Sequence, residues 1–517
     1  SEEFPEQYST TKLQEGTEYI SQSDVTRYSD NVFYLDARLN YARSFGKHNV
    51  TAMAMYMMRQ YISSVLPQRN QGFSGRATYD YDNRYLAEFN FGYNGTERLE
   101  AGKRYEFFPA MSLGWVASNE KFWTPIIDVV NYFKLRSSYG LVGSDETGLY
   151  AGAPHYLYLS NVNMYGGGNF ESGVTGGLSQ QGPMVNSYPV SNASWERATE
   201  FDIGVDLQLF KQFNFTFDWF SSKRDRILMK RASFPSVLGY QNAIPWANVG
   251  KVDNMGFEFS ANWTKQINKD WFIDARVNWT YSKNKYVYVD EPDYPYVWQT
   301  QTGKPLDAMR GYIADGLFES QAEIDASPDQ SIFGSTIMPG DIRYRDINGD
   351  NKITAEDQVM LSPYGNMPRI QYGFGISVQW KDLDVNVFFN GSAKRNIMLT
   401  GMYPFCANDS NDNNLMKWIA DSHWSEGADN SNVLYPRLGT LSTQISNNNQ
   451  PSSWWMRNGS FLRFKTLEIG YRLKWFRLYF SADNLAVWSK FKYWDPELSF
   501  NSYPLQRTFN IGLQFNL

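Results

Sequence analysis

Residues that form covalent or metal cross-links are scarce in this chain. Its 517 residues contain one cysteine, Cys406, and three histidines, His48, His155 and His423, far apart in the sequence. A single cysteine excludes a disulfide framework within the chain, and scattered histidines argue against a zinc site. Neither a Gly-x-Ser-x-Gly elbow nor a histidine–nucleophile arrangement is present. We therefore do not expect an enzyme.

Long apolar runs are also absent. The mean hydropathy is -0.51, and no uninterrupted apolar stretch approaches the ~18 residues of a membrane helix, which excludes helical membrane spans. A net charge of -6 gives no support to nucleic-acid binding, so we expect no nucleic-acid partner. Aromatic residues nevertheless make up 17% of this hydrophilic chain. Aromatic belts at two membrane interfaces would explain both properties together.

Strict alternation of apolar and polar residues is the strongest pattern present. Phe509, Ile511, Leu513, Phe515 and Leu517 alternate with polar residues or glycine up to the last residue. A strand has a period of two, so this segment has one apolar and one polar face. The same design recurs about 15 times, with mostly aromatic apolar positions. It predicts an all-β fold, the antiparallel wall of a transmembrane β-barrel with lipid outside and water inside.

One hairpin shows the design most clearly. Apolar residues occupy alternate positions over 201–209 and 213–219, and Lys211 and Gln212 lie in the short gap between these runs. Asp202 and Asp206 fall on the polar side, where a dry core would require charged partners but a wet lumen would not. A half-buried sheet of a soluble protein explains any one such strand. The repetition with aromatic faces favours the barrel.

Connections alternate between short and long. Short turns are expected near Gly46, Asn83, Lys211, Lys381 and Lys474, and long segments at 142–195, 287–369 and 392–459. Bacterial barrels have short periplasmic turns and long extracellular loops, so the long segments are predicted to lie outside the cell. Residues 1–30 are predicted to form an extracellular loop or a partial strand. Since the chain begins at Ser1 without Met or a signal sequence, and about 15 strands leave the first one unpaired, we expect a missing N-terminal portion.

Several short segments resemble one family, the SusC/RagA-type TonB-dependent transporters of Bacteroidetes outer membranes. The resemblance extends from about residue 30 to 517, and its strength lies in the order of the segments. They are Asn83-Arg84-Tyr85-Leu86, Asn94-Gly95, Phe108-Pro109-Ala110, Gly114-Trp115, Leu135-Arg136-Ser137-Ser138-Tyr139-Gly140, Trp195-Glu196, Asn248-Val249-Gly250-Lys251-Val252-Asp253-Asn254-Met255-Gly256, Pro339-Gly340-Asp341-Ile342, Asp346-Ile347-Asn348-Gly349-Asp350, Asn458-Gly459-Ser460-Phe461-Leu462-Arg463 and Ala482-Asp483-Asn484-Leu485.

The resemblance implies a fold and a function. The barrel would have about 22 strands around a plug domain, and this chain, 1–517, would be its C-terminal part, since no plug or TonB-interacting segment is found. The resemblance also implies location in the Gram-negative outer membrane, energy coupling through TonB, and a SusD-type surface lipoprotein as a lid. Such pairs import oligosaccharides or peptides. The alternatives are an adhesive or structural barrel whose loops bind host or matrix molecules, and a barrel enzyme, for which His155 or His423 would be the starting points.

Residues 346–357 read as a calcium loop of the EF-hand type. Oxygen donors fall at the ligand positions of such loops, with a backbone carbonyl at the seventh. The predicted ligands are Asp346, Asn348, Asp350, Lys352, Thr354 and Asp357. The departures are Asn351, where glycine is usual, and Asp357 in place of glutamate; Asn tolerates a left-handed backbone. An Asx-rich turn that binds no metal is the alternative.

Aromatic clusters occur in the long loops and are candidate ligand contacts. Aromatic faces stack on sugar rings, and neighbouring polar groups bond to hydroxyls. The candidates are Tyr150, Tyr156, Tyr158, Tyr165, Tyr294, Tyr296, Trp298, Trp454 and Trp455. The alternative is that these side chains pack loop on loop or meet the lid protein.

Overall fold

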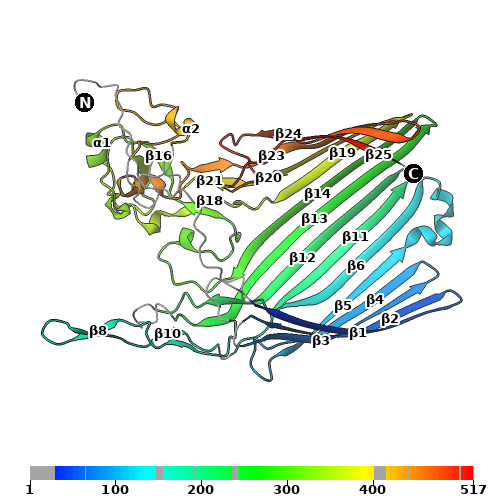
Figure 1. Cartoon of the computed structure of the whole chain (residues 1–517), viewed down its shortest axis with the longest axis horizontal. Coiled ribbons are helices and arrows are strands. Elements are labelled where there is room, and N and C mark those ends of the chain that lie inside the picture. The colour runs from blue at the N-terminus through cyan, green and yellow to red at the C-terminus, as the bar shows by residue number, and fades with distance from the viewer. Residues whose placement is uncertain are drawn as a thin grey trace, which may run out of the picture.

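One large antiparallel sheet dominates the computed structural model, which describes residues 29–63, 66–146, 155–190, 192–235, 237, 243–400, 415–439, 442–499 and 502–515. Fifteen strands pair in chain order, and Figure 1 shows them curved into a trough with β1 and β25 at its margins. The strands are β1 (Asn31–Phe45), β2 (His48–Ile62), β3 (Gln68–Tyr81), β4 (Tyr85–Thr96), β5 (Tyr105–Val116), β6 (Val130–Ser144), β11 (Glu196–Leu209), β12 (Phe213–Lys230), β13 (Trp246–Asn268), β14 (Trp271–Tyr288), β19 (Ile370–Trp380), β20 (Leu383–Ala393), β23 (Phe461–Arg472), β24 (Phe476–Ser489) and β25 (Thr508–Phe515). The predicted antiparallel all-β fold with about 15 strands is confirmed.

The predicted hairpin is the β11–β12 pair. Leu209 pairs with Phe213 and Val205 with Phe217, so apolar residues face apolar residues across the strands. The turn places Phe210 and Lys211 at φ of 52° and 56°. Two successive left-handed residues match the right-handed twist of the flanking strands. The short turns predicted near Gly46, Asn83, Lys381 and Lys474 likewise lie between paired strands.

The two faces of the sheet differ as the alternation predicts. On the apolar face, rings lie side by side across strands, and Phe213 stacks on Trp263 with centroids 5.7 Å apart. Phe217 on the same face is 44% exposed. Asp202 and Asp206 lie on the opposite, polar face, where Arg136 pairs with both. The register therefore places Phe213, Phe217 and Trp263 on one face of these strands and Asp202 and Asp206 on the other.

The connections differ at the two ends of the trough (Figure 1). The three longest, residues 145–195, 289–369 and 394–460, leave from the same end and contain short paired strands. Residues 1–28 lie outside the described residues, so the prediction for 1–30 is not described by the structure. The short pairs are β7 (Asn161–Asn163) with β10 (Met184–Ser187), β8 (Asn169–Ser172) with β9 (Leu178–Gln181), β15 (Met309–Gly311) with β18 (Val359–Ser362), β16 (Ala314–Leu317) with β17 (Ile342–Tyr344), and β21 (Asn396–Met398) with β22 (Met456–Asn458).

Helical structure is sparse and short. Within the described ranges no helix has the length and apolar character needed to cross a membrane. The α-helices are α1 (Gln321–Asp325) and α2 (Lys417–Ala420), and the 3₁₀ turns are η1 (Ala117–Asn119), η2 (Lys121–Ile126), η4 (Val297–Gln299), η5 (Ser331–Phe333), η6 (Ala355–Asp357), η7 (Ser442–Gln444) and η8 (Ser446–Asn449).

The long connections form a packed layer with its own core. We use the name loop layer for residues 289–369, 415–439 and 442–460. Its core includes Tyr344, Ile353, Tyr435 and Trp455, each at most 2% exposed. A second cluster around Leu157, Trp195 and Trp246 sits where the 155–190 segment meets the sheet. Because these residues exclude water, the loop layer is a folded structure rather than a set of separate loops.

The two faces of β12 give a direct test of the membrane assignment. Phe217→Arg places a cation on the apolar face at the fifth residue of β12, about half-way along the ~9–11 residues that a spanning strand needs, and is expected to destabilise the folded protein by about 2–4 kcal/mol. Thr216→Arg, one residue away on the polar face, is the matched control and is expected to cost far less, because that side chain meets water and Asp206. Urea titration of the intact protein folded into liposomes measures both. Equal losses for the two variants would contradict the assignment.

Candidate functional site: a cavity in the loop layer

A cavity of about 1030 Å³ lies within the loop layer. One wall comes from β16 and the residues that follow it, including Glu319 and Glu323. The other comes from residues 424–433 of the β20–β23 connection, with Trp424 and Glu426, and Trp454 also lines it. The volume lies at the upper end of the range for small-ligand sites, about 300–1,000 Å³. Two chain segments about a hundred residues apart thus build one site.

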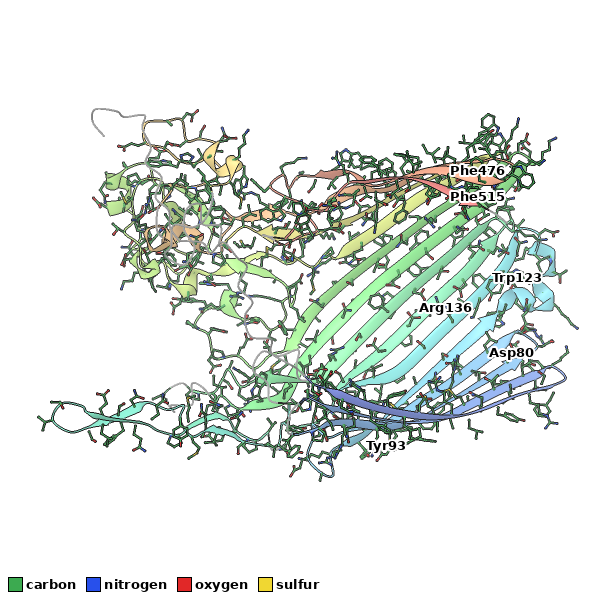
Figure 2. All side chains as sticks on the ribbon, in the orientation of Figure 1. Asp80, Tyr93, Trp123, Arg136, Phe476 and Phe515 are labelled. Carbon is green, nitrogen blue, oxygen red and sulfur yellow. The ribbon has the colours of Figure 1, made fainter. Side chains whose placement is uncertain are left out.

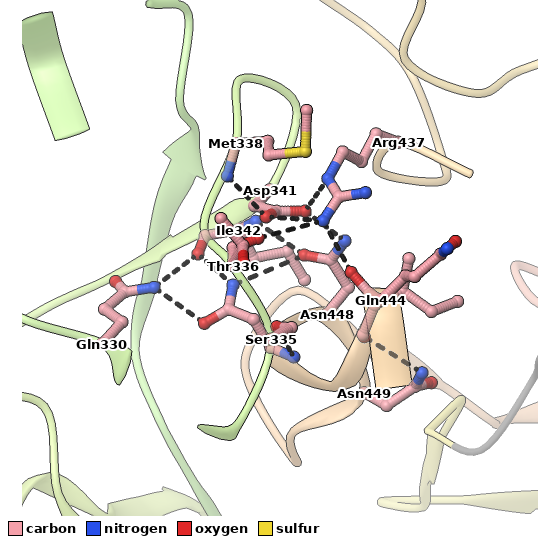
Figure 3. Close-up of polar contacts among 12 residues, drawn as sticks. Gln330, Ser335, Thr336, Met338, Asp341, Ile342, Arg437, Gln444, Asn448 and Asn449 are labelled. Carbon is pink, nitrogen blue, oxygen red and sulfur yellow. Dashed lines mark hydrogen bonds and ion pairs between the residues drawn. The ribbon is translucent and has the colours of Figure 1, made fainter. Parts of the chain in front are cut away.

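A buried ion pair holds the two walls together. Arg437 Nε lies 2.6 Å from Asp341 Oδ1, and Asp341 is fully buried. Figure 3 shows Asp341 also accepting hydrogen bonds from the backbone N–H of Met338 at 2.9 Å and from Asn448 Nδ2 at 2.8 Å. Both carboxylate oxygens therefore have donors, which is the condition under which a buried charge is tolerated.

The same network continues through buried amide side chains. Asn448 Oδ1 accepts from the Ile342 N–H at 2.8 Å, and Gln330 Nε2 donates to Asn447 Oδ1 at 2.8 Å (Figure 3). Burial raises the pKa of Asp341, and Arg437 opposes that rise. A network in which each amide bonds to a backbone group or another amide specifies one arrangement of the two segments. It therefore fixes the shape of the cavity.

The cavity is rich in carboxylates that are only partly neutralised. Glu323 pairs with Arg343, and Asp315 pairs with Arg345 at 3.1 Å. Among the described residues no ion pair involves Glu319 or Glu426. The carboxylates of the cavity provide hydrogen-bond acceptors, and the indole rings of Trp424 and Trp454 provide flat apolar faces. Chemically, the site suits a polar ligand with donor groups.

The polar face of the sheet carries ion-pair networks in which one arginine contacts two or three carboxylates. Arg136 of β6, near the middle of the sheet (Figure 2), lies 2.6 Å from Asp218, 3.3 Å from Asp206 and 3.5 Å from Asp202. Arg477 pairs with Glu468 at 2.6 Å and also with Asp384. These side chains are partly exposed, so water screens them and they form a wettable wall instead of a dry core.

Arg276 lies on the polar face of β14 between Asp274 and Asn278 in the alternation, but its neighbour is an aromatic ring. Its guanidinium lies 5.2 Å from the ring centroid of Phe388. Asp274 instead accepts hydrogen bonds from Asn262 and Thr264, both at 3.0 Å. The aromatic ring on the polar face, which the alternation does not predict, provides the cation–π partner.

The aromatic residues predicted to contact ligand fall into separate places. Tyr150 lies outside the described residues. Tyr156 and Tyr158 lie beside each other, and the Tyr156 hydroxyl donates to the carbonyl of Pro67, between β2 and β3, at 2.7 Å. Tyr165 is 73% exposed on the projecting 155–190 segment. Two of the others, Tyr296 and Trp298, stack in parallel with centroids 4.5 Å apart.

Tyr294 is half-buried in the β14–β19 connection, outside any helix or strand. The last two candidates divide between the cavity and the core. Trp454 lines the cavity. Trp455 is 1% exposed, donates from Nε1 to the Asn448 carbonyl at 2.6 Å, and packs loop against loop. Trp424 and Glu426, which also line the cavity, were not predicted. They lie in an aperiodic segment, and only the tertiary structure brings them to the 315–343 wall.

The predicted calcium loop is a compact turn built on its own carboxylates. Asp346 accepts from the N–H groups of Gly349 and Asn351 at 2.7 and 2.8 Å. Asp357, fully buried, accepts from Ile347 at 2.8 Å and from Thr354 at 2.7 Å. Asn351 has the left-handed φ of 64° that its position requires.

The surroundings of this loop are equally ordered. Ile353 is buried beneath it, and Trp298 Nε1 donates to the Glu356 carbonyl at 2.7 Å. Within the described part of the chain, no group of three or more His, Cys, Asp or Glu side chains is placed to hold a metal ion. A calcium ion in this loop would therefore also need the side-chain oxygens of Asn348 and Thr354 and the backbone carbonyl of Lys352. Calcium binding stays a prediction.

Comparisons with known proteins agree on one family. The family model for TonB dependent receptor-like β-barrels matches residues 3–485. TonB-dependent receptor P3 of Formosa agariphila is 24% identical, over 92% of this chain and 51% of the relative. TonB-dependent receptor SusC of Bacteroides thetaiotaomicron is 25% identical, over 85% of this chain and 43% of the relative. The chain spans about half the length of these curated relatives.

A solved structure has the same fold. The structure of the RagAB peptide transporter aligns with a TM-score of 0.70 at 19% identity, covering 94% of this chain and 55% of that chain. The resemblance to SusC/RagA-type barrels is therefore confirmed.

Calcium binding at 346–357 can be tested by its effect on stability. If the loop binds calcium, a concentration of 100 times the Kd is expected to stabilise the loop layer by about 2.7 kcal/mol, seen as a rise in Tm. Asp350→Ala removes one ligand and is expected to abolish the rise. Asp325→Ala, an exposed carboxylate elsewhere in the loop layer, is the control and is expected to keep it. A Tm that neither calcium nor a chelator changes would refute the prediction.

Proposed function

Because the chain belongs to the TonB-dependent receptor-like β-barrel family and lies in the outer membrane, we propose that it is the barrel part of an importer for oligosaccharides or peptides. The observation that carries the proposal is the pairing of a wettable, charge-lined sheet face with a folded cavity at the long-connection end. A ligand captured in the cavity would have a polar wall to pass along. The family is one of transporters and receptors, not of enzymes.

Energy for import would enter through other parts of the assembly. A packed loop layer and a polar wall provide binding and a path, but they do not provide a driving force. We propose coupling through TonB to a plug domain, with the N-terminal plug and barrel segments as structural partners. A peptide transporter among the solved structures of the same fold supports peptides as one substrate class. The carboxylates and tryptophans of the cavity are compatible with peptides and with glycans.

Uptake by cells that lack the intact protein tests the function. Deletion is expected to abolish growth on one class of substrate, defined oligosaccharides or defined peptides, and complementation is expected to restore it. The double variant Trp424→Ala, Trp454→Ala removes two flat faces of the cavity and is expected to reduce uptake at least tenfold. Phe217→Leu, on the apolar face, is the control and is expected to transport normally.

Two further outcomes are informative. Transport that continues when the proton-motive force is collapsed would contradict coupling through TonB. Normal uptake of every substrate after deletion, with loss of binding of cells to host or matrix molecules, would replace import by the adhesive alternative.

We also propose a partner surface for a SusD-like lipoprotein on the projecting 155–190 segment. Figure 1 shows β8 and β10 extending away from the sheet. Among the residues that the structure describes, none covers the apolar side chains of this ribbon, since Met164, Phe170 and Leu178 are 62%, 72% and 65% exposed. Exposed apolar surface of this kind marks a protein interface.

Co-purification of the intact protein with its surface lipoprotein tests this docking surface. The double variant Phe170→Asp, Leu178→Asp places charges in the proposed interface and is expected to lower the recovered lipoprotein at least tenfold. Gln181→Asp adds one charge to the opposite face of the same hairpin, where Gln181 pairs with Asn169, and is expected to retain the lipoprotein. Unchanged recovery with the double variant would exclude the ribbon as the docking surface.

A further inference from the structure

The β5–β6 connection differs from every other described connection at the short-turn end of the sheet. The others span two or three residues, as at Gly46 and Lys47, whereas this one runs over residues 117–129 and contains η1 and η2. Figure 2 labels Trp123 in this segment, which projects beyond the ends of the strands. Its length is not needed to join two adjacent antiparallel strands, so it has another use.

The segment folds back along the apolar face of the sheet. The ring of Phe122 lies 6.4 Å from that of Trp115, and the ring of Trp123 stacks on Phe133 at 5.3 Å. Trp115 pairs with Tyr85, and Phe133 with Leu207, so both belong to the apolar face. The connection therefore lies on the bilayer side of the wall and not across the polar face.

Apolar side chains on this segment have no cover within the described structure. Phe122, Ile126, Ile127 and Val129 are 63%, 45%, 40% and 46% exposed. The Trp123 indole N–H is bonded to the Val130 carbonyl at 2.9 Å, which leaves its ring as an apolar surface with a satisfied polar edge. Such a set is costly in water and favourable at a membrane interface.

A groove of about 490 Å³ opens on the apolar face beside this segment. Its floor is a lateral row across five strands, in which Tyr79 pairs with Ala87, Ala87 with Leu113, Leu113 with Ser137 and Ser137 with Ile203. Two small residues in that row replace the large side chains usual elsewhere. Tyr85, Trp115 and Leu135 border the groove on the side of the connection.

The next row along the same strands, on the side away from the connection, carries large side chains. Phe89 pairs with Met111, and Met111 with Tyr139, all on the apolar face. The groove is therefore a local depression in the apolar face, with a row of large side chains on each side. The groove is wide because the side chains of Ala87 and Ser137 are small, while the strands beneath it remain paired.

We propose that this groove seats an acyl chain of one phospholipid and that residues 117–129 anchor that lipid at the membrane interface. Because the short turns are predicted to face the periplasm, the lipids beside this end of the strands are those of the periplasmic leaflet, which consists of phospholipid. An acyl chain matches an apolar groove on a bilayer-facing wall. Lys121 is exposed at the start of η2 and forms no ion pair within the described residues, so its ammonium is available to the lipid phosphate.

Native mass spectrometry of the intact protein tests the site. The protein is extracted from vesicles of phosphatidylethanolamine and phosphatidylglycerol, and the retained phospholipids per barrel are counted. The wild type is expected to retain one phospholipid that the groove-filled variant Ala87→Leu, Ser137→Leu has lost. Ala275→Leu makes one comparable enlargement on the apolar face of β14 and is expected to retain the phospholipid.

A second variant separates lipid loss from misfolding. Ile126→Asn, Ile127→Asn leaves the groove intact and removes apolar anchor surface, and it is expected to weaken lipid retention at least threefold while the heat-modifiable folded band remains. Equal retention by wild type and groove-filled protein would overturn the proposal. So would loss of the lipid from Ala275→Leu, because the effect would then not be specific to the groove.

Discussion

The absence of water in the hydrocarbon layer is the constraint on which the structure depends. A backbone N–H or C=O left unpaired there costs several kcal/mol, so every spanning segment must pair with its neighbours. Antiparallel strands satisfy this demand only side by side, and each strand then has one face toward lipid and one toward water. The rings of Phe213 and Trp263 on one face, and the shared carboxylates around Arg136 on the other, are both consequences of that geometry.

This constraint also explains what could be predicted from the sequence. The period of two gives both the face and the register, because a slip of one residue in β11–β12 would move Val205 and Phe217 to the water side and Asp206 to the lipid side. The short turns follow as well, since they must lie between runs of opposite direction. The loop layer has no such period. Asp341 and Arg437 are almost a hundred residues apart, and nothing local in either segment marks them as an ion pair.

The candidate site was therefore only partly predictable. Trp454 and Trp455 are adjacent and chemically alike, yet one lines the cavity and the other is buried with its indole bonded to Asn448. The difference is set by the buried amide network, in which Asn447 and Asn448 bond to residues near 330–344. Because that network has fully bonded carboxylate and amide groups, the cavity walls are held by directional interactions as well as by apolar packing.

Departures from a pattern carry as much information as the pattern. Ala87 and Ser137 both lie on the apolar face, but they lack the bulk of their neighbours Leu113 and Ile203, and Ser137 is polar where the alternation predicts an apolar residue. A wall selected only for contact with fluid lipid has no reason to place two small residues in one lateral row beside a long connection whose rings pack on the same face. The groove, the exposed apolar segment and the rings of Trp115 and Trp123 lie together at one end of β5 and β6, and this is the arrangement that a seated phospholipid chain requires.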